Sequence, residues 1–327
     1  MSSPSQVSRR SLDSTRKAGA SRTTVLIALA ANGLIAVAKL IGGVASGSTA
    51  LLAEAGHSVA DTTNQAFLLG SISLAGREPT ERHPFGHGNQ RFLWTFMAAV
   101  GMFVAGAVFA VGYGVIELVS GAKEEGGFAA AWITLAIALV AEGTSWVRAL
   151  RQTRGEAREA DKRVRRYVTE SRDPSVKMVL FEDTAALVGI LIAAVGIALH
   201  QITGSAFWDP AASILIGVLL IGVAVRMATD TGRLLVGAAA LPEEREAIER
   251  VLEEHDAVEE VIELLTMVLG PNALLVAARI DIADGVDGDH LERAMSDLDD
   301  AVRKAVPDVT EVFLDPTPGR RQPAAHA

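Results

Sequence analysis

Long apolar stretches separated by short polar segments dominate the first two thirds of the chain. A transmembrane helix needs about 20 mostly apolar residues, and six stretches meet this requirement: Thr23–Ala45, Ser48–Ala75, Phe92–Val119, Phe128–Leu150, Val176–Gln201 and Phe207–Thr229. Glycine and serine residues lie between several of them, as expected for turns. The pattern predicts an α-helical membrane protein with six transmembrane helices.

The periodicity changes after the last apolar stretch. A charged amphipathic helix is predicted at Leu241–Glu254, because acidic residues fill its first turn, and a second helix at Asp287–Val306. Strands are predicted at Val258–Val268, Ala273–Ile282 and Val309–Leu314. The order helix, strand, strand, helix, strand favours a small α+β domain of ferredoxin-like type.

Charge is distributed unevenly between these two regions. The 327 residues carry a net charge of −9, yet residues 241–316 alone contain 21 acidic and 6 basic residues, a net charge of −15. The membrane part is therefore net positive and is followed by an acidic domain. We divide the chain into a basic cytoplasmic tail (1–22), a transmembrane domain (23–236), a cytoplasmic ferredoxin-like domain (237–316) and a disordered tail (317–327).

The basic residues of the loops predict the orientation in the membrane. Five Lys or Arg residues precede the first stretch and three lie between the second and third. Ten lie from Arg148 to Lys177, around the loop between the fourth and fifth, whereas the alternate loops contain only Lys123. Because cytoplasmic loops carry the excess of Lys and Arg, we expect both termini to be cytoplasmic and the protein to lie in the cell's inner (plasma) membrane. We interpret residues 1–22 as a basic anchor, although their Ser- and Arg-rich composition also resembles a transit peptide.

Several ionisable residues lie inside the apolar stretches, where a charged side chain costs at least ~2.5–3.5 kcal/mol. The second stretch contains Glu54, His57 and Asp61, and the fifth contains Glu182 and Asp183. His57 and Asp61 are four residues apart, so they lie on one helical face one turn from each other. The chain has no cysteine, which leaves imidazole and carboxylate groups for any metal chemistry.

These groups suit a divalent transition metal such as zinc. Imidazole nitrogen and carboxylate oxygen bind zinc at about 2.0–2.2 Å, and they bind protons when the metal leaves, since imidazole has an ordinary pKa near ~6.5. Metal-for-proton exchange is therefore available, with a structural, hydrogen-bonding role as the alternative. Glu142 in the fourth stretch could have either role, in transport or in the structure, because Arg148 follows nearby as a partner for a structural ion pair.

Two motifs resemble those of the cation diffusion facilitator family of metal/proton antiporters. One is STALLAEAGHSVAD at residues 48–61, and the other is HPFGHG at residues 83–88. The resemblance covers residues 22–316. Its zinc-transporter-nine-like branch is the most similar, through the pairs Asn64-Gln65 and Glu182-Asp183.

The family's transport site uses two residues of the second helix and two of the fifth. The resemblance therefore implies which residues of this chain occupy those positions. His57 and Asp61 match the second-helix positions, and a histidine at the first of them implies zinc. Asp183 matches the second fifth-helix position, but the first is Val179, which cannot bind a metal. Either water completes a site of three protein ligands, or Glu182, about 100° from its neighbour around the helix, takes part.

The resemblance leaves two further metal positions open. His83 and His87 match a loop that can hold a second metal in the family; alternatively, Phe85 and its neighbours pack the loop under the helices. In the acidic domain, Ile262 and Phe313 replace the histidines that bind metal in some members. We therefore expect that domain to support homodimerisation without a metal of its own.

Residues and resemblance together predict a secondary transporter that exports a divalent metal, zinc by preference, from the cytoplasm in exchange for protons. Its partners would be the metal ion, protons, the lipid bilayer and a second copy of the chain, with no organic cofactor. Val179 raises the alternative of a membrane scaffold or metal sensor that has lost transport. The sequence lacks the HExxH, GxSxG and P-loop motifs of enzymes, and its basic residues flank membrane segments, which argues against nucleic-acid binding.

Overall fold

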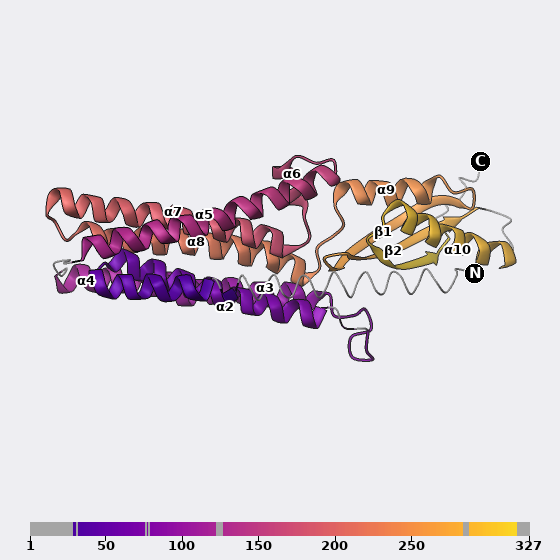
Figure 1. The fold of residues 1–327 in the computed structure, drawn as a ribbon. Helices are drawn as coiled ribbons and strands as arrows, with labels where there is room; N and C mark the ends of the chain where they lie inside the picture. Colours follow the sequence, from indigo (N-terminus) through magenta and orange to yellow (C-terminus); the bar gives the residue numbers. More distant parts are fainter. Residues whose placement is uncertain are drawn as a thin grey trace, which may run out of the picture. The chain divides into compact units, whose positions relative to one another are not determined.

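The computed structural model describes residues 29–318 apart from 31, 76, 78, 122–126 and 284–287. The chain divides into two compact units, one made of Met1–Leu74 with Leu93–Thr231 and the other of Ala75–Phe92 with Gly232–Ala327. The first unit is helical, and the second contains a small sheet (Figure 1). The predicted tail 1–22 and almost all of 317–327 lie outside the described residues, and the predicted domain boundaries stay predictions.

The first unit is built from helices, and its long apolar ones run side by side (Figure 1). After a helix at Asn32–Ser46, they are α2 (Thr49–Ala75), α3 (Asn89–Met102), the π-helix η1 (Phe103–Val108), α4 (Phe109–Ser120), α5 (Phe128–Glu159), α6 (Val164–Glu170), α7 (Pro174–Thr203) and α8 (Trp208–Val236). Among the described residues, four helical segments are long and apolar enough to cross a membrane: Asn89–Ser120, Phe128–Glu159, Lys177–Thr203 and Trp208–Val236.

Four of the six predicted spans thus correspond to helices that are long and apolar enough to cross a membrane, and the number of six stays a prediction. Helix Asn32–Ser46 is apolar but shorter, and the beginning of the predicted first span lies outside the described residues. Helix α2 has 27 residues, but its polar residues make it less apolar than the four. The same side chains that suggest a functional site therefore weaken the membrane signal of the helix that carries them.

Small residues allow the membrane helices to pack closely. Alanines from several helices are fully buried together with larger aliphatic residues; this core includes Ala50, Leu51, Ala107, Ala110, Ala131, Ile190, Ala193, Ile216 and Leu220. Large apolar side chains such as Ile41, Val140 and Leu191 are exposed on the outside of the bundle. An exposed apolar surface of this extent fits a lipid environment.

Asp209 at the beginning of α8 caps the beginning of α2. Its carboxylate accepts hydrogen bonds from the Ser48 hydroxyl at 2.7 Å and from the backbone N–H of Ala50 at 3.0 Å, as well as from the N–H of Thr49. The first N–H groups of a helix have no partner within the helix, and the positive end of its dipole favours a carboxylate. This contact ties α2 to α8 at one end of the bundle.

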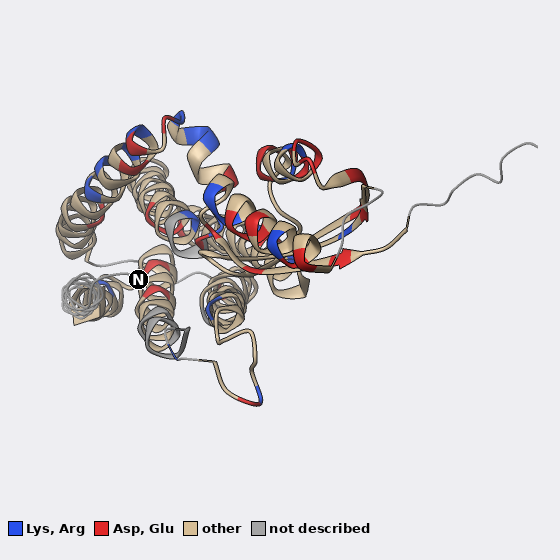
Figure 2. Ribbon diagram, turned by 90° about the vertical axis from the view of Figure 1, so that its right-hand side faces the viewer, with Lys and Arg blue, Asp and Glu red and all other residues tan. Residues whose placement is uncertain are grey.

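The second unit has the predicted order of elements: α9 (Pro242–Glu253), β1 (Val258–Gly270), β2 (Ala273–Ile282), α10 (Gly288–Ala305) and β3 (Val309–Pro316). The strand order is β1-β2-β3, with β1 and β2 antiparallel and β2 and β3 parallel. The core of this unit includes Ile248, Leu252, Leu274, Val276, Leu298 and Val302. Acidic residues crowd the helices that pack on the sheet (Figure 2), in agreement with the acidic composition.

The segment Ala75–Phe92, which contains the HPFGHG motif, belongs to the second unit. The rings of Phe85 and Phe313 meet edge to face at 6.4 Å between centroids, and Phe92 is part of the core of this unit. Gly88 allows the chain to pass the end of β1, because a Cβ there would lie 2.4 Å from the Leu269 carbonyl oxygen. The motif therefore packs within the unit of the small sheet.

Candidate metal centre in the membrane helices

One face of α2 is both polar and buried. Glu54, His57, Asp61 and Asn64 follow one another at intervals of three or four residues, which places them on the same side of the helix. Each of these four residues is at most 4% exposed. Burial of this many polar groups is unfavourable unless they have partners, so their surroundings decide what they can do.

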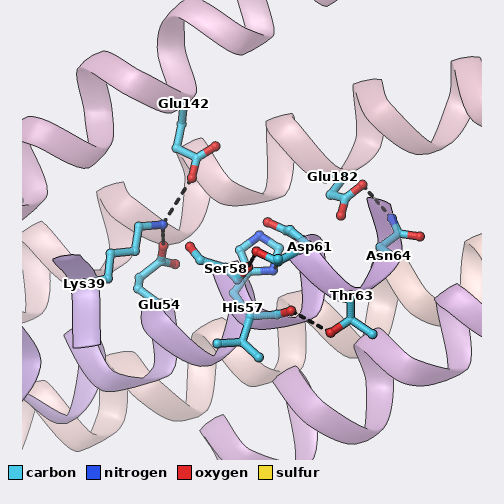
Figure 3. Close-up of polar contacts among 11 residues, drawn as sticks. Lys39, Glu54, His57, Ser58, Asp61, Thr63, Asn64, Glu142 and Glu182 are labelled. Atoms are coloured by element: carbon cyan, nitrogen blue, oxygen red, sulfur yellow. Dashed lines mark hydrogen bonds and ion pairs between the residues drawn. The ribbon is translucent and has the colours of Figure 1, made fainter. Parts of the chain in front are cut away.

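Glu182 of α7 faces this polar side of α2 (Figure 3). Its carboxylate accepts a hydrogen bond from the Asn64 side-chain amide at 2.8 Å, and Asp61 lies near it on the same side of α2 (Figure 3). The Nδ1 atom of His57 lies 3.5 Å from Oδ1 of Asp61. The structure therefore brings together three of the four predicted ligands, His57, Asp61 and Glu182.

Asp183, the fourth predicted ligand, points in another direction. Its Oδ2 accepts a hydrogen bond from the Ser145 hydroxyl of α5 at 3.0 Å. Val179, one turn before Asp183, is 37% exposed, whereas Met178, one turn before Glu182, is 2% exposed. The buried face of α7 therefore runs through Met178 and Glu182, and the valine that replaces an expected ligand lies on the outer side of the helix.

Several buried polar atoms of this group have no hydrogen-bond partner among the described residues: both ring nitrogens of His57, Oδ1 of Asp61, Oε1 of Glu182, the Ser58 hydroxyl, and the side-chain oxygens of Asn64 and Gln65. Most buried polar atoms in folded proteins are satisfied, and imidazole nitrogen and carboxylate oxygen are zinc-binding atoms. No three His, Asp or Glu side chains within the described ranges yet lie close enough to hold a metal ion. A small movement of side chains or helices would be needed to close a site.

The π-helix η1, within the helical segment Asn89–Ser120, passes close to α2 near His57. A Cβ atom at Gly106 in η1 would lie 3.1 Å from Cδ1 of Leu220 and 3.9 Å from the Cα of His57. Glycine at this position makes the close approach possible. Short π-helical segments inside α-helices are rare and often occur at functional sites. The position of η1 next to the polar face of α2 is therefore consistent with a functional site there.

Lys39 lies beside this group and was not predicted. Its ammonium nitrogen is 3.0 Å from Oε2 of Glu54 and 3.3 Å from Oε1 of Glu142 (Figure 3). All three side chains are buried. Glu142, for which Arg148 was the alternative partner, is therefore paired with Lys39. A lysine within an apolar stretch was the sequence signal that could have revealed this cluster.

The loop histidines lie next to each other in the second unit. The ring centroids of His83 and His87 are 4.4 Å apart, and Nδ1 of His87 is 2.9 Å from the side-chain nitrogen of Gln90. Burial, followed by the charges of His83 and Arg77, lowers the pKa of His87. No third His, Asp or Glu joins them at metal-binding distance in the described part of the chain, so a second metal site here stays a prediction.

Residues 25–236 match the family model of the cation efflux transmembrane domain. The chain belongs to the cation diffusion facilitator family. This cation diffusion facilitator is 33% identical over 276 residues to the proton-coupled zinc antiporter SLC30A9, mitochondrial, of Xenopus laevis, covering 84% of this chain and 49% of the relative. It is 32% identical over 294 residues to the human protein of the same name, covering 89% of this chain and 51% of the relative. The predicted similarity to the zinc-transporter-nine-like branch is confirmed.

The metal tolerance protein C4 of Arabidopsis thaliana is 30% identical over 236 residues, which are 72% of this chain and 51% of the relative. This cation diffusion facilitator thus spans about half the length of the relatives it matches. The SLC30A9 relatives are named as antiporters and not as enzymes, which supports the expected non-enzymatic function at the level of the family. The SLC30A9 relatives are named as mitochondrial, and this contradicts the expected location in the plasma membrane. The basic loops on which that expectation rested set an orientation, but they do not distinguish one membrane from another.

Proposed function

We propose that this protein is a secondary antiporter that exchanges a divalent transition-metal ion, zinc by preference, for protons. The observation that carries the proposal is the group of buried, unpartnered nitrogen and oxygen atoms of His57, Asp61 and Glu182 between α2 and α7. A metal ion would satisfy these atoms, and protons would replace it when it leaves. The family and the names of the antiporter relatives support this function.

The ligands we propose are His57, Asp61 and Glu182, with water or a further protein group completing the coordination. Asp183 then serves mainly to hold α7 against Ser145 of α5. Of the two alternatives, water or Glu182, the proposal adopts Glu182, and the burial of this residue on α7 supports it. We further propose that the ion is exported from the compartment that contains the carboxy-terminal domain.

A flux assay in proteoliposomes tests the proposal. With zinc on one side, the purified protein should move protons in the opposite direction, and a panel of divalent metals should show which ions it accepts. Asp61→Ala should abolish metal-driven proton flux. Asp230→Ala, which removes a carboxylate from an exposed pair with Arg226 on α8, is the matched control and should retain it. Normal flux from well-folded Asp61→Ala protein would refute the assignment.

A scaffold or sensor without transport is the competing function. The valine at position 179 suggested this competing function. Val179 lies on the outer side of α7, however, and does not interrupt the buried group of His57, Asp61 and Glu182. A scaffold would bind zinc, or a partner, without proton movement. The absence of flux from correctly folded wild-type protein with every metal of the panel would favour it.

A further inference from the structure

The cluster of Lys39, Glu54 and Glu142 lies outside the proposed ligand set. Helix Asn32–Ser46 exposes apolar residues such as Leu34 and Ile41, whereas Lys39 is fully buried. A lysine at membrane depth is unfavourable, and such residues generally mark ion pathways or functional partners. The cluster joins this helix to α2 and α5, so it needs an explanation of its own.

The Lys39 ammonium nitrogen lies between two carboxylates, as a bound cation would. The Lys39 ammonium lies between Oε2 of Glu54 at 3.0 Å and Oε1 of Glu142 at 3.3 Å (Figure 3). Two carboxylates that converge on one point are also a suitable ligand pair for a divalent cation. Without Lys39, Glu54 and Glu142 would form a negatively charged pair inside the membrane domain.

A second observation is that the Glu54 carboxylate is only partly used by the lysine. Its other oxygen, Oε1, is buried and has no hydrogen-bond partner within the part of the chain that the structure describes. This atom points at Gly189 of α7, where a Cβ would lie 2.0 Å from it. A glycine at this point of α7 therefore leaves space for the carboxylate, and an unused oxygen faces the same side.

The cluster is adjacent to the proposed metal centre along α2. Glu54 precedes His57 by three residues, which corresponds to about 4.5 Å along the helix axis, and both side chains are on the polar face. An ion that moves from His57 toward the beginning of α2 would meet Glu54 next. Two unshielded carboxylates there would retain a divalent cation, and retention would slow its release.

We propose that Glu54 and Glu142 form a second cation position on the ion's path and that the Lys39 ammonium fills it between passages. Lys39 is a tethered cation that competes with the transported ion, so the two carboxylates guide the ion without trapping it. This inference rests on the proposed antiport function. It assigns Lys39 to transport, whereas a purely structural ion pair would only join the helices.

Metal stoichiometry of the purified full-length protein tests the proposal, with zinc as the probe in equilibrium dialysis or calorimetry. Wild type should bind one ion tightly per chain. Lys39→Met should bind two, and the double variant Lys39→Met/Glu54→Gln should again bind one. Zinc-driven flux of Lys39→Met should fall by roughly tenfold, which corresponds to about 1.4 kcal/mol of stronger retention. Lys39→Arg, which keeps the charge, should bind one ion and recover flux.

Lys177→Met is the control, because Lys177 is a lysine at the beginning of a membrane helix that donates to the carbonyl oxygen of Thr169 and, among the described residues, to no carboxylate pair. It should bind one ion. If Lys39→Met does not fold, the Glu54→Gln variant tests the proposal instead. Its zinc-driven flux should fall, while its zinc affinity at the proposed metal centre should stay unchanged. One bound ion and normal flux in Lys39→Met, or normal flux in Glu54→Gln, would overturn the proposal. A wild-type protein that neither binds nor moves zinc would instead overturn the antiport function itself.

Discussion

At the scale of single residues, the orientation of two neighbours on α7 decides which of them can bind a metal. Glu182 and Asp183 are adjacent and carry the same group, but one faces α2 and the other bonds to Ser145 of α5. The difference follows from the ~100° step between successive helical residues. The sequence predicts that this pair is functional, but it does not tell which member faces inward, since the family pattern favours Asp183.

The two residues should therefore respond differently to removal of charge. Glu182→Gln should weaken zinc binding by at least about tenfold, because even outer-shell partners of metal ligands contribute 10–100-fold. Asp183→Asn should keep the hydrogen bond from Ser145 and change the affinity little. Calorimetry on both purified variants measures this. Equal losses, or a loss in Asp183→Asn alone, would contradict the orientation of α7.

The imidazole of His57 should influence which metal is chosen. Nitrogen is a softer ligand than carboxylate oxygen and favours zinc over harder ions such as manganese. His57→Asp should therefore broaden selection toward manganese and cadmium. Competition between metals in the flux assay would reveal this change, whereas an unaltered metal profile would exclude His57 as the selectivity residue.

At the scale of helices and strands, the regular elements were predicted well and their contacts were not. The strands at residues 258, 273 and 309 begin where they were expected, because alternation and turn residues are local signals. The ion pair of Lys39 with Glu142 joins residues 103 positions apart, and no local signal connects them. The π-helix η1 was also missed, since its residues Phe103–Val108 are as apolar as the flanking helix.

The contact between Asp209 and α2 gives a test at this scale. Asp209→Asn removes the charge and weakens the cap of Ser48 and Ala50, so the free energy of unfolding should fall by about 1 kcal/mol. Thermal unfolding followed by tryptophan fluorescence would detect it. Asp230→Asn, on the same helix but in an exposed pair with Arg226, is the control and should have little effect. An unchanged midpoint in Asp209→Asn would show that the cap contributes nothing.

At the scale of the whole molecule, one face of the small sheet carries exposed apolar side chains. Leu265, Ala277 and Phe313 are register neighbours across β1, β2 and β3, and both Leu265 and Phe313 are more than half exposed. Beside them, Arg279 pairs with Glu263 and Asp315. A row of apolar side chains next to an ion-pair row suits an interface of moderate size, and the family resemblance implies homodimerisation through this domain.

Dimerisation should respond to salt and not to chelators. Residues 241–316 carry a net charge of −15, so two copies repel each other, and salt screens exposed charges beyond about 10 Å at 0.1 M. The dimer fraction of the full-length protein in detergent should therefore increase with ionic strength in analytical ultracentrifugation. Leu265→Asp should reduce it, because it adds a charge to the apolar row; Glu292→Gln on α10, away from that row, is the control. A chelator should change little, since the family resemblance matches Ile262 and Phe313 to the positions at which some members have metal-binding histidines. Conversion to monomer on removal of metal would show that a structural metal joins the two copies after all.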